Sequence, residues 1–134
     1  MKTGILTLCD FAKDYNGQMS LMGTFNVIHS VSFPTFFSFC IAAQFYLKVS
    51  ETGKKKVRIS ITDKKDGTIL MPQQELQINI PIPPNFDEEK EIMHNIVMNF
   101  GNVNLPTEGT YLINFEIDDF KSELELYAIL TKNA

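Results

Sequence analysis

Apolar and polar residues alternate with a period of two along almost the whole chain. Between residues 36 and 49, for example, Phe39, Ile41, Ala43, Phe45, Leu47 and Val49 follow one another at every second position. That period matches the side chains on one face of a β-strand, whereas an amphipathic helix repeats every 3.6 residues. The pattern therefore predicts an all-β protein.

Turn residues divide this pattern into strands at a spacing typical of a sandwich. Asn16-Gly17 is a hairpin signal, residues 64–67 end on a glycine, and prolines follow residue 80. Proline ends a strand because it donates no hydrogen bond to a ladder. We expect one helical turn over the acidic residues 87–91. The predicted strands cover residues 3–11, 18–30, 36–49, 55–63, 68–71, 75–82, 91–103, 111–117 and 123–131.

Residues 105–111 read Leu-Pro-Thr-Glu-Gly-Thr-Tyr and precede one of these strands. The segment resembles the tyrosine corner of Greek-key sandwiches, in which a Tyr hydroxyl bonds to backbone a few residues upstream. We expect Tyr111 to be buried, with its hydroxyl bonded near residues 105–108. With eight or nine strands, the corner predicts one immunoglobulin-like β-sandwich domain over residues 1–134.

Composition and charge narrow the classes of function. The 134 residues are 44% apolar and 21% charged, with a formal net charge of −4. A mildly acidic chain is a poor candidate for non-specific nucleic-acid binding, and we interpret the lysines around residues 54–58 and 64–65 as solvated hairpin ends. No apolar run approaches the ~18 residues of a membrane span. Leu8 stands where a lipoprotein signal needs a small residue before the cysteine, so we expect a cytoplasmic protein.

The two cysteines are Cys9 and Cys40. In a reducing compartment both are expected to be free, largely buried thiols. A disulfide between neighbouring strands is the alternative.

Motifs that carry chemistry are missing from the sequence. It has no phosphate-binding glycine loop, no metal-binding Cys/His spacing and no Gly-x-Ser-x-Gly elbow. His29 and His94 fall on the inward parity of their strands and are interpreted as core or strand-end histidines. Asp63, Asp66 and the pair Asp118-Asp119 could bind calcium at one end of a sandwich, but the lysines among them favour ordinary turns. We predict no catalytic residue, no cofactor and no metal.

Several strands are apolar on both faces, and this carries the prediction of function. Leu112, Tyr127 and Ile129 occupy outward positions on the last two strands, as Met22, Ile28, Tyr46 and Val97 do elsewhere. Exposed apolar surface usually marks a contact site, unless a loop covers it. We predict a non-enzymatic interaction module that forms homo-oligomers through a sheet face. The alternative is a binder of carbohydrate or peptide that uses a groove beside Phe36 or Phe37.

Several segments together resemble a known family. They are Leu-Cys-Asp-Phe-Ala at residues 8–12, Asn-Gly at 16–17, Gly-Thr-Phe at 23–25 and Phe-Pro at 33–34, joined by Asp-Gly at 66–67 and the corner above. This pattern is similar to that of a family of small bacterial proteins of unknown function, although Gln18 stands where Lys is common. The resemblance implies a bacterial, cytoplasmic β-sandwich and brings no catalytic residues.

Overall fold

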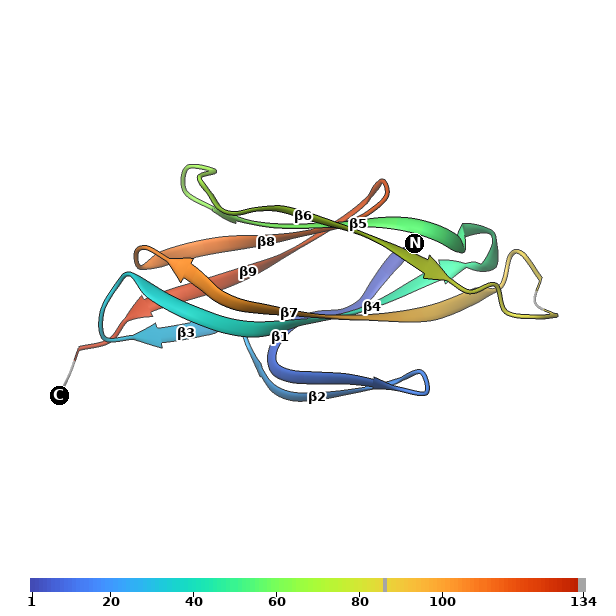
Figure 1. Ribbon diagram of the computed structural model, residues 1–134, viewed down its shortest axis with the longest axis horizontal. Helices are drawn as coiled ribbons and strands as arrows, with labels where there is room; N and C mark the ends of the chain where they lie inside the picture. Colours follow the sequence, from blue (N-terminus) through green and yellow to red (C-terminus); the bar gives the residue numbers. More distant parts are fainter. Residues whose placement is uncertain (86, 133–134) are drawn as a thin grey trace.

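The computed structural model describes residues 1–85 and 87–132, and in this part of the chain nine strands form two facing sheets. Sheet A has the strand order β2-β1-β4-β7, and sheet B has the order β3-β9-β8-β5-β6 (Figure 1). The prediction of an all-β sandwich is confirmed. The elements are β1 (Lys2–Tyr15), β2 (Gln18–Phe25), β3 (Val27–Ser30), β4 (Thr35–Lys48), the 3₁₀ helix η1 (Val49–Glu51), β5 (Gly53–Asp63), β6 (Ile69–Ile80), β7 (Glu91–Leu105), β8 (Gly109–Ile117) and β9 (Phe120–Leu130).

The chain passes repeatedly from one sheet to the other. It crosses from β2 to β3, returns to β4, crosses to β5, returns from β6 to β7 and crosses again to β8. β3 runs parallel to β9, whereas the other strand pairs are antiparallel. Each sheet is therefore assembled from segments that lie far apart in the sequence.

Four predicted elements differ from the structure. Residues 18–30 form two strands in different sheets, because the chain changes sheet at Asn26, whose carbonyl accepts the Tyr127 N–H at 2.8 Å. Residues 68–71 and 75–82 contribute to one strand, β6, whose edge position and irregular register accommodate Pro72. The helical turn expected over residues 87–91 is wrong. That segment forms a turn in which the Lys90 N–H bonds to the Asp87 carbonyl.

The main core lies between the two sheets. Alternate side chains of β4 face alternate side chains of β5 and β8, and the rings of Phe45 and Phe115 stack with centroids 5.2 Å apart. Each such side chain stabilises the fold by about 1.5–3 kcal/mol through burial. Tyr111 lies at one end of this core and is fully buried. Its hydroxyl donates to the Thr107 carbonyl and accepts from the Thr107 N–H, so the predicted corner is confirmed.

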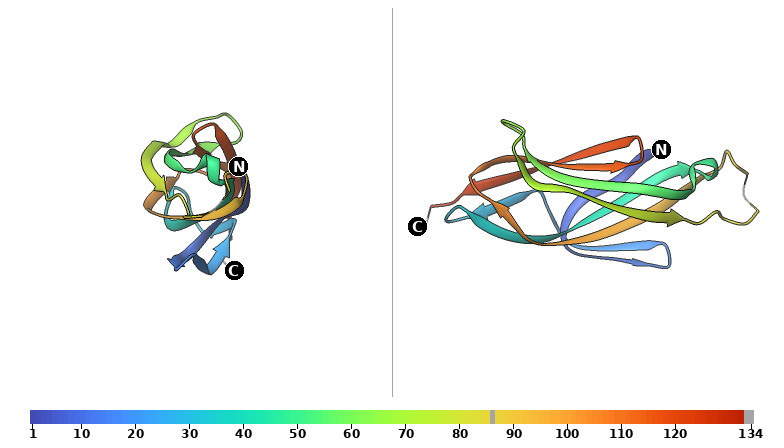
Figure 2. Two further views of the ribbon diagram at one scale, coloured as in Figure 1. Left: turned by 90° about the vertical axis from the view of Figure 1, so that its right-hand side faces the viewer. Right: turned by 45° about the horizontal axis from the view of Figure 1, so that its top comes forward.

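A hairpin adds a partial third layer on the outer side of sheet A. The far half of β1 and all of β2 leave the sheet and fold back across it (Figures 1 and 2). Apolar side chains of the hairpin contact apolar side chains of the sheet, and the Asn95 side-chain amide donates to the Gly17 carbonyl at 3.1 Å. The contacting side chains are Ala12, Met19 and Leu21 on one side and Cys9, Cys40, Ala42 and Val97 on the other.

Gly23 is placed where the hairpin bends. Its φ is +66°, and a β-carbon there would lie 2.3 Å from a carboxylate oxygen of Asp10. Only glycine adopts this conformation without a steric penalty. The covering hairpin explains why outward positions on β4 and β7 are apolar. On this face of sheet A, the apolar residues are therefore covered by another segment of the chain, which was the alternative to a contact site.

Candidate functional site

The predicted interaction face lies on the outer side of sheet B. Tyr127 is 37% exposed and Ile129 is 38% exposed, while Leu112 is half-buried. In the register of the sheet, Leu112 faces Glu125 and Tyr127 faces Thr110, so Leu112 and Tyr127 are diagonal neighbours. Ile129 follows Tyr127 by two positions on β9, so Tyr127 lies between Leu112 and Ile129 on the same outward face.

A polar network runs beside these apolar residues. Glu125 accepts hydrogen bonds from the Lys64 ammonium and from the Tyr127 hydroxyl. The hydrogen bond from Lys64 lowers the pKa of Glu125, and the bond to Glu125 raises the pKa of Tyr127. The hydroxyl of Tyr127 is thus tied to a neighbouring side chain on the same strand, β9.

A second band of apolar and small polar residues extends the face towards β6. Ile69 is 65% exposed and pairs with Thr62, which pairs with Leu112 across the next ladder. Ile69, Thr62 and Leu112 therefore form one row across three strands. Ile69 and Leu112 are the apolar members of this row, and Thr62 lies between them.

Four charged residues form another row across the same face, separated from the first by the row that contains Ser60 and Asn114. Cross-strand register places Glu75 of β6 beside Arg58 of β5, Arg58 beside Glu116 of β8, and Glu116 beside Lys121 of β9. The Arg58 guanidinium lies 3.2 Å from Glu75 and 3.7 Å from Glu116. The row thus reads negative, positive, negative, positive from one edge strand to the opposite side of the sheet.

Two surface hollows border this face. One has a volume of about 220 Å³ and is lined by Asn114, Glu116 and residues 121–123 of β9. The other, of about 460 Å³, lies between residues 63–66 and residues 107–110. Neither borders Phe36, which is 64% exposed. Phe37 is not an exposed aromatic, because its ring packs inward against Phe25 with centroids 5.4 Å apart.

The two histidines lie in different sheets. His94 is half-buried on the inward parity of β7, as predicted, and burial lowers its pKa. The inward position predicted for His29 is wrong. His29 is exposed beside Ile129, because Ile28 is the residue of β3 that points into the core. The structure does not bring the two histidines together.

The paired carboxylates serve as turn residues. Asp63 and Asp66 each accept a backbone N–H two residues further along the chain. Asp118, with a φ of +49°, accepts the Lys56 N–H at 2.8 Å, which lowers its pKa. The turn interpretation is confirmed for these three residues. In the described part of the chain, no cluster of three His, Cys, Asp or Glu residues is arranged to hold a metal ion.

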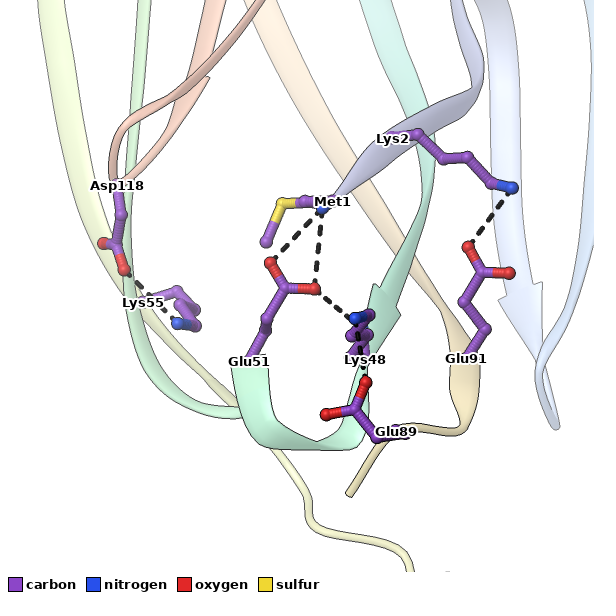
Figure 3. Close-up of polar contacts among 8 residues, drawn as sticks. All are labelled: Met1, Lys2, Lys48, Glu51, Lys55, Glu89, Glu91 and Asp118. Carbon is purple, nitrogen blue, oxygen red and sulfur yellow. Dashed lines mark hydrogen bonds and ion pairs between the residues drawn. The ribbon is translucent and has the colours of Figure 1, made fainter. Parts of the chain in front are cut away.

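Ion pairs gather at the end of the sandwich that holds η1 (Figure 3). The amino group of Met1 lies 3.3 Å from the Glu51 carboxylate, which also accepts the Lys48 N–H at 2.8 Å. That backbone hydrogen bond is the main reason why the pKa of Glu51 is lowered. Lys48 also pairs with Glu89, and Lys2 pairs with Glu91. These contacts tie β1 and η1 to the connection that leads into β7.

Cys9 and Cys40 are paired residues on adjacent strands, and both are free, fully buried thiols. Burial, reinforced by the neighbouring Cys40, raises the pKa of Cys9 to about 11. Thiolate is the reactive form of cysteine, so the structure makes Cys9 a poor nucleophile at neutral pH.

Comparison with known sequences places the chain in a family. The profile of a family of unknown function, DUF6941, matches residues 4–128. The chain belongs to this family. No curated protein matches it. The match begins in β1 and ends in β9, so the DUF6941 region includes both sheets and the covering hairpin. Resemblance to a family of unknown function is therefore confirmed over most of the chain.

The charged row of this DUF6941 protein was not predicted from its sequence. Its members lie 17, 58 and 5 positions apart in sequence, and only strand register brings Glu75, Arg58, Glu116 and Lys121 together. The available signal was a charged residue at an outward position on each of four strands.

No helix among residues 1–85 and 87–132 has the length and apolar character needed to cross a membrane.

Proposed function

We propose that this protein is a non-enzymatic interaction module that forms a homodimer through the outer face of sheet B. The observation that carries the proposal is the grouping of Leu112, Tyr127 and Ile129 on one face, with Ile69 on the same face. Apolar side chains gathered on one sheet face lower the free energy when a partner removes them from water. The proposal includes no catalytic role.

Two further features belong to this proposal. The strand order, the parallel pairing of β3 with β9 and the bonded Tyr111 corner support an immunoglobulin-like Greek-key topology. The two free thiols support a cytoplasmic location, because reducing compartments keep cysteines unpaired.

Small-ligand binding is the second candidate. Phe36 favours it, because an exposed aromatic ring gives a carbohydrate or a peptide a surface for stacking. The two hollows described above lie elsewhere, so the ring has no neighbouring cavity among them. Self-association therefore ranks first.

The test compares two double variants with the unmutated protein by static light scattering at high protein concentration, without a column step that would dilute a weak dimer. Leu112→Lys with Ile129→Lys should give a folded monomer, because it places charges in the apolar part of the sheet B face. Phe11→Lys with Met22→Lys is the matched control, since it makes the same kind of change on the exposed side of the hairpin. Loss of dimer in the control alone would move the interface to the hairpin and overturn the proposal.

A further inference from the structure

The charged row on sheet B has a property that bears on how two copies would meet. Read across the sheet from β6 to β9, the row consists of Glu75, Arg58, Glu116 and Lys121. Read in the opposite direction, the signs are positive, negative, positive, negative. Two such rows laid face to face in opposite order therefore place an opposite charge over every member.

We propose that two copies associate face to face through sheet B, about a two-fold axis that runs parallel to the strands between β5 and β8. This inference rests on the proposed function and adds the geometry of the dimer. The axis brings β8 of one copy over β5 of the other and β9 over β6. Glu75 then faces Lys121 of the second copy, and Arg58 faces Glu116, with each contact made twice.

Other two-fold arrangements of the same faces lose this match. An axis that runs along the row lays each residue over its own equivalent, so every contact joins like charges. An axis along β8 lays Glu116 over Glu116 and Arg58 over Lys121. Like charges held together across an interface disfavour an arrangement, whereas complementary potentials set orientation and register. The charged row selects one arrangement among those that sheet stacking allows.

The apolar residues follow the same rotation. Leu112 of β8 lies over Thr62 of the second copy, next to the axis. The exposed Ile69 of β6 lies over Glu125 of β9, and Tyr127, two residues further along β9, is its diagonal neighbour across the interface. Exposed ion pairs contribute little affinity. In this dimer the apolar contacts therefore provide the binding free energy, and the charged row provides the orientation.

The experiment uses two charge-reversal variants of the full chain, Glu75→Lys and Lys121→Glu. Each variant alone places like charges at both symmetric contacts, so its dissociation constant should rise roughly tenfold or more relative to the unmutated protein. In an equimolar mixture, the heterodimer has an attractive contact at both sites. Sedimentation velocity should then show association restored to within about threefold of the unmutated protein.

The mixture also controls for effects inside one chain. Glu75→Lys removes the contacts of Glu75 with Arg58 and Lys56 in its own copy, but this loss is the same alone and in the mixture. Lys13→Glu and Glu88→Lys, exposed residues away from sheet B, form a matched pair that should change association neither alone nor mixed. Glu75→Gln and Lys121→Gln serve if a reversal variant fails to fold, and each should weaken association less than reversal does.

The outcomes separate this inference from the proposed function. If the unmutated protein dimerises and the mixture associates no better than either variant, the axis is wrong and the proposed function stands. If the unmutated protein is a monomer even at high concentration, both the proposed homodimer and its two-fold arrangement are wrong. The apolar face of sheet B would then bind a different protein. Restored association in the mixture supports the two-fold arrangement.

Discussion

At the scale of single residues, Tyr111 anchors the turn between the two sheets through one buried hydroxyl. Its substitution by Phe removes the bond to the Thr107 carbonyl and should lower the free energy of unfolding by about 1–2 kcal/mol. Tyr127→Phe is the control, because this hydroxyl bonds at the exposed surface and its loss should cost less than about 0.5 kcal/mol. Equal denaturation midpoints for the two variants would contradict the account.

The cysteines give a second prediction at this scale. Both thiols should resist an aromatic disulfide reagent in the native protein, because both are fully buried and the pKa of Cys9 is raised. After unfolding without reductant, both should react. One measurement of thiols per chain in denaturant checks this, and a count of zero would mean that Cys9 and Cys40 are joined.

Residue roles could be predicted where they depend on local sequence. The turn glycine and the distance to Tyr111 in residues 105–111 specify the corner, so the buried tyrosine was predictable. His29 was not, because β3 is a separate strand and its parity is set by the change of sheet at Asn26. A continuous alternation from residue 18 to residue 30 hides that change.

At the scale of elements, the bend in the β1–β2 hairpin depends on Gly23. Gly23→Ala should destabilise the protein by about 1–2 kcal/mol. Alanine is strained at this positive φ, and its β-carbon would approach the Asp10 carboxylate too closely. Thermal unfolding measures the loss, and faster labelling of Cys40 would report the opened hairpin.

Gly101→Ala is the matched control for this prediction. Gly101 also lies in a strand, but a β-carbon there would meet only the Ser38 hydroxyl at 4.0 Å. Its effect should stay within about 0.5 kcal/mol. A Gly23→Ala protein as stable as Gly101→Ala would mean that the hairpin does not need this bend.

Strand existence was predictable and strand partnership was not. The period of two located most of the strands, because each has a face in the core. It could not show that β1 pairs with β4 in its first half and bends with β2 in its second half. That arrangement depends on tertiary contacts of Ala12, Met19 and Leu21. The charged row was hidden for the same reason, since register is a property of paired strands.

At the scale of the whole molecule, the structure limits the strength of the proposed dimer. Tyr127 and Ile129 are each a little over one third exposed, so covering them yields about a third of the ~1.5–3 kcal/mol that full burial of such a side chain provides. Association also costs translational and rotational freedom. We therefore expect a weak, reversible dimer that forms at high protein concentration.

Sedimentation equilibrium of the unmutated protein tests the central claim most directly. The concentrations should span about 10 µM to about 1 mM, the range of dissociation constants that corresponds to binding free energies of about −7 to −4 kcal/mol. The account predicts an average mass that rises from 15.3 kDa towards twice that value. A mass that stays at 15.3 kDa across the whole range would contradict self-association through sheet B.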